Sequence, residues 1–320
     1  MKRSDFLLFL LLFIYTGVFA QKQNVYLIKN NGQYVEKQDS ADFIRIVQEP
    51  DTGSELFIVK EYYKDGKLKS LGLSRKVDPP LYEGTYRSMY DNGSKKQIAN
   101  FAKGKLTGQV LNYYPNGELY SCLIYNDAAP GSDSAPYQVM QVNDSTGKSL
   151  VKDGNGLCEF YDNDFRYISS RGMIKNGEYD GLWTGEDRNL GITYKETYAA
   201  GKIISGESTD LENVTVSYTK PEVKPEFKGG AANFYRYLAR SIRYPPNAQR
   251  LWKQGVVLVN FAVEKDGSLN DLKVFNYADQ ELAAEALRVV QQSPPWEPGT
   301  MRGRKVRVMF NVPISFTLSR

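Results

Sequence analysis

The chain has 320 residues, of which 41% are hydrophobic and 24% are charged, and its formal net charge is +4. This length accommodates about two domains, and the composition is typical of a water-soluble globular protein, which excludes a collagen-like or disordered chain. The chain contains no histidine, which excludes a Ser-His-Asp triad, a Cys-His pair and histidine-based zinc sites. We therefore expect a protein that is not an enzyme, with no catalytic residues, no metal site and no cofactor.

An enzyme that relies on carboxylates, such as a glycosidase, is the alternative that survives the missing histidine, with Asp162 and Asp164 as its candidates. Pairs of acidic residues are frequent in the turn segments of this sequence, and acidic residues are common in turns generally. We interpret these two as turn residues.

The N-terminus has the layout of a secretory signal peptide. A short positive start precedes the apolar run at residues 6–15, and small residues lead up to Ala20. This pattern predicts cleavage between Ala20 and Gln21. The apolar stretch is 15 residues long when it is counted to Ala20, whereas a membrane-spanning helix needs about 20. We expect loss of residues 1–20 and a mature protein in the periplasm or cell envelope; an uncleaved inner-membrane anchor is the alternative.

Export affects the interpretation of the two cysteines, Cys122 and Cys158. In an oxidising compartment the pair can form a disulfide, which here would close a loop of 36 residues. Two buried thiols are the other interpretation, and the sequence leaves both open.

Residues 21–218 repeat a short phrase. It reads E-Y-Y-K-D-G-K-L-K at 61–69, M-Y-D-N-G-S-K-K at 89–96 and N-Y-Y-P-N-G-E-L-Y at 112–120. Each copy places an Asp-Gly or Asn-Gly pair between strand-forming residues, which predicts a tight primed hairpin turn. Further turns are predicted between the copies, as in K-G-K-L-T-G and N-G-E-Y-D-G.

Two short strands cannot bury a face by themselves, but stacked copies cover one another. We therefore expect an elongated, twisted antiparallel sheet, with Tyr62, Tyr90, Tyr114 and Trp183 filling the space between repeats. An aromatic binding surface for protein, lipid or glycan is the alternative use of these side chains. Over residues 60–206, approximately, the copies resemble the variant form of MORN-type repeats.

Residues 219–226 contain two prolines and four charges. This composition predicts a short, semi-rigid spacer between two domains.

Residues 227–320 follow a different pattern. Apolar residues at helical spacing predict a first helix, which ends at the prolines 245–246. Two strands are predicted on either side of the turn at 266–267, and Asp279 can cap a second helix. Strict alternation of apolar residues from Val306 predicts a last strand. The order α-β-β-α-β predicts two helices on one face of a small antiparallel sheet. The whole chain is thus expected to be α+β.

This second part also resembles the TonB C-terminal domain family. The resemblance is carried by F-K-G-G at 227–230, R-Y-P-P-N-A at 243–248, Q-G-V-V-L-V-N-F-A-V-E-K-D-G-S-L at 254–269, E-L-A-A-E-A-L-R-V-V at 281–290 and P-P-W-E-P-G at 294–299. It implies a domain that binds the short TonB box of outer-membrane transporters and transmits energy from an inner-membrane motor. This chain has no long spacer and its N-terminal segment looks cleavable, so peptide binding is favoured over energy transduction.

The charge is divided unequally. Residues 227–320 contain 14 Lys/Arg against 7 Asp/Glu, whereas residues 21–226 contain 25 against 29. The basic residues Arg302, Arg304, Lys305 and Arg307 form a cluster. Export argues against nucleic acid as a partner. We interpret the cluster as a solvated strand end whose charges prevent aggregation, or as a surface that attracts acidic peptides.

Pro313 predicts that the last strand is an edge, because proline cannot donate to a ladder. Backbone groups alternate sides along an antiparallel strand, so the residues of the same parity should face the open edge. These candidate partner-binding residues are Lys305, Arg307, Met309 and Asn311. Such an edge can accept an extended peptide by strand addition, which is how the TonB family is known to bind its box, or a second copy of the chain as a homodimer.

The sequence therefore predicts a non-catalytic cell-envelope protein that binds extended, TonB-box-like peptides of an outer-membrane transporter or another envelope protein. It predicts no nucleic acid and no small-molecule substrate among the partners. A membrane-anchored energy transducer and a repeat scaffold without a transport role are the alternatives.

Processing is directly testable. Mass spectrometry of the protein purified from its host should show a mature chain that begins at Gln21. Intact Met1 in the membrane fraction would instead establish the anchored form.

Overall fold

The computed structural model describes residues 22–126, 137–274 and 279–318. The expected signal peptide and its cleavage site between Ala20 and Gln21 lie outside the described residues. The chain divides into two compact units, one formed by residues 1–127 with 143–148 and the other by residues 128–142 with 149–320. The second unit holds both the later hairpins and the helical C-terminal part, so the domain boundaries at 218 and 227 remain a prediction.

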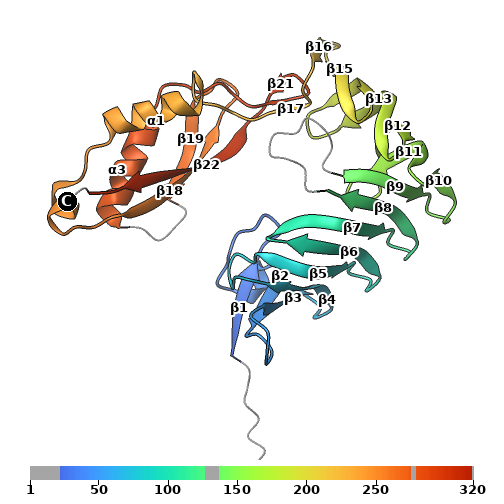
Figure 1. Ribbon diagram of the computed structural model, residues 1–320, viewed down its shortest axis with the longest axis horizontal. Coiled ribbons are helices and arrows are strands. Elements are labelled where there is room, and N and C mark those ends of the chain that lie inside the picture. The colour runs from blue at the N-terminus through green and yellow to red at the C-terminus, as the bar shows by residue number, and fades with distance from the viewer. Residues whose placement is uncertain (1–21, 127–136, 275–278, 319–320) are drawn as a thin grey trace, which may run out of the picture. The chain divides into compact units, whose positions relative to one another are not determined.

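The first unit is an antiparallel sheet in which each strand pairs with the next one along the chain (Figure 1). Its elements are β1 (Gln23–Ile28), a 3₁₀ helix (Gln38–Ser40), β2 (Phe43–Gln48), β3 (Phe57–Tyr63), β4 (Leu68–Ser74), β5 (Tyr82–Met89), β6 (Lys95–Ala102), β7 (Lys105–Tyr113) and β8 (Leu119–Tyr125).

The second unit continues the hairpin pattern, and β10 to β16 again pair in chain order. The strands are β9 (Tyr137–Asn143), β10 (Ser149–Lys152), β11 (Asn155–Tyr161), β12 (Ile168–Lys175), β13 (Glu178–Asp187), β14 (Ile192–Ala199), β15 (Lys202–Asp210) and β16 (Thr215–Tyr218). The predicted sheet of hairpin repeats is confirmed.

The turns of the repeated phrase differ from the prediction. In the first copy Gly66 alone has a positive φ, the Gly66 N–H donates to Tyr63 O, and the Tyr63 N–H donates to Lys67 O. This is a three-residue turn with a bulge, not a primed turn. The side chain of Asp65 accepts the Lys67 N–H at 3.1 Å, which stabilises the turn without a second positive φ.

Primed turns occur instead at the hairpin ends between the phrases. At 103–104 and 176–177 both central residues have positive φ, for example 52° at Asn176 and 82° at Gly177. The same holds at 153–154 and 200–201. Two turn types thus serve different connections of the sheet.

Successive hairpins are joined by a ladder of tyrosine hydroxyls. The Tyr63 hydroxyl donates to Met89 O at 2.7 Å, and the Tyr90 hydroxyl donates to Tyr113 O at 2.7 Å. The Tyr114 hydroxyl continues the series to the carbonyl of residue 143 at 2.9 Å. Tyr90 and Tyr114 therefore lie between repeats as predicted, whereas in the first copy this position belongs to Tyr63 and not to its neighbour Tyr62.

Trp183 fills the corresponding space in the second unit, where it is 1% exposed. Its ring centroid lies 4.3 Å from that of Tyr179, and its Nε1–H donates to Met173 O at 3.1 Å. A Cβ on Gly172 would approach the indole within 2.3 Å. The glycine thus makes room for the tryptophan of the next strand.

The expected spacer at 219–226 is hydrogen-bonded into the C-terminal part. Glu222–Val223 forms β17, which pairs with β20 (Thr300–Met301), and β20 pairs in turn with β21 (Arg304–Lys305). The backbones of Glu226 and Glu297 exchange hydrogen bonds of 3.0 and 2.8 Å. The prolines keep this segment extended, but it is a strand of a small sheet and not a free linker.

The C-terminal part has the predicted α-β-β-α-β core, with α2 and the β20–β21 hairpin added. Its main elements are α1 (Gly230–Ser241), α2 (Pro246–Arg250), β18 (Gly255–Val263), β19 (Leu269–Val274), α3 (Gln280–Gln291) and β22 (Val308–Phe316), with sheet order β19-β18-β22. Phe234 and Leu238 of α1 and Val289 of α3 are packed against the inner face of that sheet. Asp279 caps α3 as expected, accepting the Glu281 N–H at 3.0 Å. Across the described ranges, none of the helices is long and apolar enough to span a bilayer.

The possible disulfide between Cys122 and Cys158 is not formed. Both are free cysteines and both are buried, Cys122 on β8 and Cys158 on β11. Burial raises the pKa of the Cys158 thiol well above its ordinary value, so this sulfur is a poor nucleophile for disulfide exchange.

Thiol labelling of unreduced protein should therefore give two reactive thiols per chain after denaturation. The folded protein should react far more slowly, because both sulfurs are shielded. A denatured, unreduced chain that does not react at all would establish the disulfide instead.

Candidate functional site

The last strand, β22, forms one edge of the C-terminal sheet, since β18 is its single neighbour among the described strands. Pro313 lies opposite Leu258 in this antiparallel pair. Because proline has no N–H, this pair is of the non-hydrogen-bonded type, and so is every second pair along the strand. The backbone N–H and C=O groups of Met309 and Asn311 therefore point away from β18, toward the open edge.

The four residues expected on that edge do not stay together. Lys305 lies in β21, which belongs to a different sheet from Met309 and Asn311. Arg307 lies between β21 and β22, and its guanidinium forms an ion pair with Glu264 at 2.8 Å. The strand begins two residues later than its alternation predicts, and its open edge offers Met309 and Asn311.

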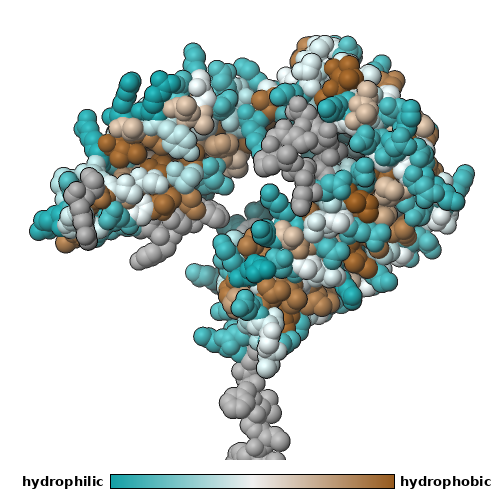
Figure 2. Space-filling model, in the orientation of Figure 1, coloured by the Kyte–Doolittle hydropathy of each residue, from teal (hydrophilic) through white to brown (hydrophobic). Residues whose placement is uncertain are grey.

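A groove of about 430 Å³ lies beside this edge. One wall is β22 at residues 310–313, and the other is the segment 224–227 with the start of α1. Its aromatic lining includes Phe227, Phe234, Trp296 and Phe310. Figure 2 shows hydrophobic surface between the positions that α1 and β22 occupy in Figure 1. A groove of this size and lining is typical of a ligand site.

Trp296 organises the floor of the groove. Its ring is 5.2 Å from that of Phe234 and 5.4 Å from that of Phe310, both in edge-to-face geometry. It is 5% exposed, and its Nε1–H donates to Ser293 at 3.0 Å. Buried aromatic contacts of this kind add about 0.5–1.5 kcal/mol per pair, and they stabilise the position of the Trp296 ring.

The basic cluster is not a solvated strand end. The side chain of Arg302 is 20% exposed, forms an ion pair with Glu196 at 3.1 Å and lies over the ring of Tyr194 at 3.7 Å. Arg304 forms an ion pair with Asp210 at 2.6 Å. Carboxylates of the repeat sheet thus neutralise two of the four charges within the chain. Sequence reasoning failed here because the partners lie about 100 residues away.

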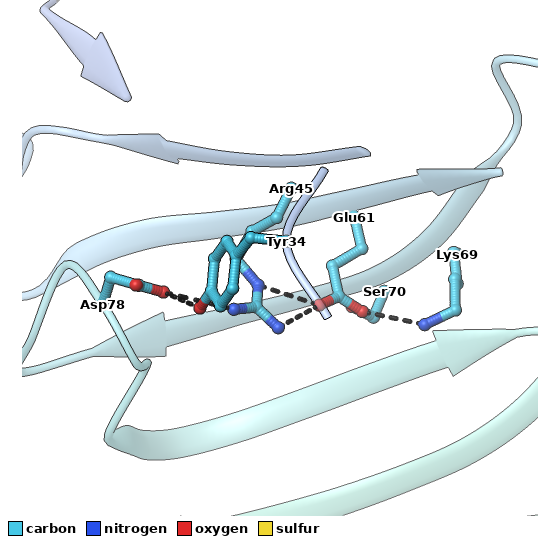
Figure 3. Close-up of polar contacts among 6 residues, drawn as sticks. All are labelled: Tyr34, Arg45, Glu61, Lys69, Ser70 and Asp78. Carbon is cyan, nitrogen blue, oxygen red and sulfur yellow. Dashed lines mark hydrogen bonds and ion pairs between the residues drawn. The ribbon is translucent and has the colours of Figure 1, made fainter. Parts of the chain in front are cut away.

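A dense polar cluster in the first unit surrounds Glu61 of β3 (Figure 3). This side chain is 5% exposed and contacts Arg45 at 2.9 Å, Lys69 at 3.0 Å and the Ser70 hydroxyl at 3.0 Å. Burial by itself would raise the pKa of Glu61, but the charges of Lys69 and Arg45 outweigh it and hold that pKa below its ordinary value. An ionised carboxylate held in this way is a structural group and a poor general acid.

The cluster continues to the surface through Asp78. The Tyr34 hydroxyl donates to Asp78 at 2.7 Å, and Arg45 lies 3.5 Å from the same carboxylate. Burial and the hydrogen bond to Asp78 raise the pKa of Tyr34 to about 12. The tyrosine is therefore neutral at physiological pH.

A second buried glutamate, Glu196 on β14, repeats this arrangement near the other end of the repeats. It is 4% exposed and accepts hydrogen bonds from the hydroxyls of Tyr198 at 3.0 Å and Tyr218 at 2.7 Å. The two glutamates share the phrase K-E-x-Y, at 60–63 and 195–198. Sequence reasoning missed both, although a charged residue at an inward strand position of two copies was the signal.

Asp162 and Asp164 are turn residues, as interpreted. Asp162 accepts the N–H groups of Arg166 and Tyr167, and Asp164 forms an exposed ion pair with Arg166 at 2.8 Å. Neither carboxylate lines the groove.

Comparison with known families agrees with this architecture. Residues 240–318 match the family described as Gram-negative bacterial TonB protein C-terminal. The C-terminal domain is TonB-like. Residues 58–74 and 106–127 match the MORN repeat variant. Both resemblances seen in the sequence are thereby confirmed, and the first supports a TonB-like protein of the Gram-negative envelope.

Among solved structures, the solution structure of the TonB C-terminal domain of Helicobacter pylori is similar to this chain at 26% identity. The match covers 28% of this chain and 80% of that one, with a TM-score of 0.23. No curated protein matches the chain.

The buried ion pair predicts a specific pH dependence. Folding lowers the pKa of Glu61. The ionised Glu61 therefore contributes its full share to the free energy of unfolding when the pH is above its pKa in the unfolded chain, about 4.3. This contribution is lost as the pH falls through its lower pKa in the folded protein. Glu61→Gln should reduce the free energy of unfolding at pH 7 by about 3 kcal/mol, because two cations lose their partner. The difference from the parent should shrink in acid, as measured by urea unfolding at several pH values.

Glu83→Gln is the matched control, since Glu83 forms an ion pair with Arg75 at the surface. Exposed pairs contribute little, so this variant should unfold close to the parent. Equal effects of both substitutions would contradict a special role for Glu61.

Proposed function

We propose that this chain is a non-catalytic protein of the cell envelope whose TonB-like domain binds extended peptide segments by strand addition to β22. The partner is a TonB-box-like segment of an outer-membrane transporter or of another envelope protein, which links the chain to outer-membrane transport. The observation that carries the proposal is the open edge of β22 lying directly beside an aromatic groove.

The geometry of the edge defines how a peptide would lie. Side chains of Phe310 and Val312 face the core, whereas those of Met309 and Asn311 are exposed on the other face. A strand added to β22 alternates in the same way, so every second peptide side chain enters the groove. The chemistry of the groove favours a large apolar or aromatic side chain at that position.

The expected affinity is modest. Each backbone hydrogen bond contributes about 0.5–1.5 kcal/mol, and burial of an aromatic side chain in the groove adds about 1.5–3 kcal/mol. These gains are offset by the loss of freedom on association. Weak, reversible binding suits a contact that must form and break repeatedly.

A proline scan of the edge tests the docking geometry. Met309→Pro removes a donor that faces the open edge and should weaken binding by about 10-fold or more, while the domain stays folded. The probe is a heptapeptide of alternating threonine and valine with one central phenylalanine, measured by titration calorimetry. Replacing its phenylalanine with alanine should also weaken binding, because the groove then stays unfilled.

Two controls complete the design. Met309→Thr keeps the backbone donor and should bind like the parent. Val308→Pro removes a group that pairs with Val263 of β18 and should unfold the domain. If Met309→Pro binds the probe as tightly as the parent does, docking on β22 is refuted; if the parent self-associates through this edge, sedimentation will show a dimer in place of a peptide complex.

A further inference from the structure

The β20–β21 hairpin is fixed to the end of the repeat sheet by two arginines. Arg302 places its guanidinium between the ring of Tyr194, at 3.7 Å, and the carboxylate of Glu196, at 3.1 Å. The carbonyl of Arg302 accepts the Ser208 hydroxyl at 2.8 Å. This contact thus combines a charge pair, a cation–π contact and a backbone hydrogen bond, each largely removed from water.

Arg304 forms a second anchor on β15 and on Val214, the residue just before β16. It forms an ion pair with Asp210 at 2.6 Å, and it donates to the Ser208 carbonyl at 3.2 Å and to the Val214 carbonyl. Figure 1 shows β21 next to β16, in agreement with these contacts. We call the contacts of Arg302 and Arg304 with the repeat sheet the arginine clamp.

The clamp is connected to the wall of the peptide groove by backbone hydrogen bonds. The Arg302 N–H donates to Pro221 O at 2.6 Å, and β20 pairs with β17 at Glu222–Val223. The chain then runs directly into the wall segment 224–227. Three consecutive residues thus separate the paired strand β17 from Phe227.

A second path leads from the hairpin to the opposite wall. The Val306 N–H donates to Gly299 O at 2.9 Å, just before β22 begins. A Cβ on Gly299 would lie 2.7 Å from Val308 and 3.1 Å from Pro225. Gly299 therefore lies where the two walls approach each other, next to the hairpin that the clamp holds.

We propose that the arginine clamp sets the width of the peptide groove, so that the repeat sheet is a positioning element for peptide binding. This inference rests on the proposed function of β22. Arg302 and Glu196 are positioning residues, because they contact the hairpin and the repeat sheet and do not line the groove. The kind of peptide that binds is the one proposed above, but the affinity for that peptide depends on the contacts of the clamp, which lie outside the TonB-like fold.

The test uses the full mature chain with Glu196→Gln and, separately, Arg304→Ala. Glu196→Gln keeps the shape of the side chain and removes its charge, so the sheet should stay folded. Hydrogen exchange of the backbone amides in the segment 221–227, which are those of residues 222–224, 226 and 227 because 221 and 225 are prolines, should become faster in both variants. Affinity for the phenylalanine-containing heptapeptide should fall by about 3- to 10-fold, the usual size of coupling through packed elements.

The matched control is Glu159→Gln, which removes the charge of another glutamate of the same sheet, paired with Arg171 at 3.3 Å. It should change neither readout. Arg302→Ala is measured as a third single variant. Its combination with Glu196→Gln should lose no more than the worse of these two single variants, because both residues belong to one contact.

The two proposals fail in different ways. If the parent does not bind the peptide, the proposed function fails, yet faster exchange at 221–227 still supports the mechanical link from clamp to wall. If exchange at 221–227 is the same in the parent and both clamp variants, the positioning role is refuted whether or not the peptide binds.

Discussion

The fold depends on a limit of small sheets, since a two-stranded hairpin in water is marginally stable at best. In this chain a tyrosine hydroxyl of one hairpin donates a hydrogen bond to a backbone carbonyl of the following hairpin. Tyr63 donates to Met89 O, and Tyr90 donates to Tyr113 O. The carbonyls that receive these bonds belong to Met89 and Tyr113, the last residues of β5 and β7. The repeated tyrosine thus connects each of these hairpins to the next one along the sheet.

A second constraint, the cost of burying a charge, accounts for the surroundings of the two buried glutamates. Each lies on an inward position of a repeat strand, and a buried charge is tolerated when it is paired and hydrogen-bonded. Glu61 obtains its arginine from the neighbouring strand β2, whereas Glu196 obtains its arginine from the C-terminal hairpin. The K-E-x-Y phrase therefore buries a glutamate in both places, but a different element supplies the arginine that pairs with it. At Glu196 the resulting ion pair connects the repeat sheet to the C-terminal hairpin.

Much of this architecture could be predicted from local patterns. Alternation and turn residues located the repeat strands, helical spacing and Asp279 located the helices, and Pro313 identified the edge strand. Errors arose wherever a distant partner decides the outcome. The pairing of residues 222–223 with 300–301, like the burial of Arg302, depends on chain segments some 80 to 100 residues away. Turn type was missed because Asp65 supports a bulged turn with its side chain, which the dipeptide Asp-Gly does not distinguish from a primed one.

The shortness of the open edge of β22 has a consequence for self-assembly. Its start is blocked because Arg304 and Lys305 belong to another sheet, and Arg307 is held by Glu264 and Asp271. Within it, Pro313 interrupts the row of donors, so a sheet that grew strand by strand would meet a missing bond in every layer. The edge is therefore a poor template for a fibril. In this way the chain can keep an unpaired strand exposed with little tendency to polymerise through it.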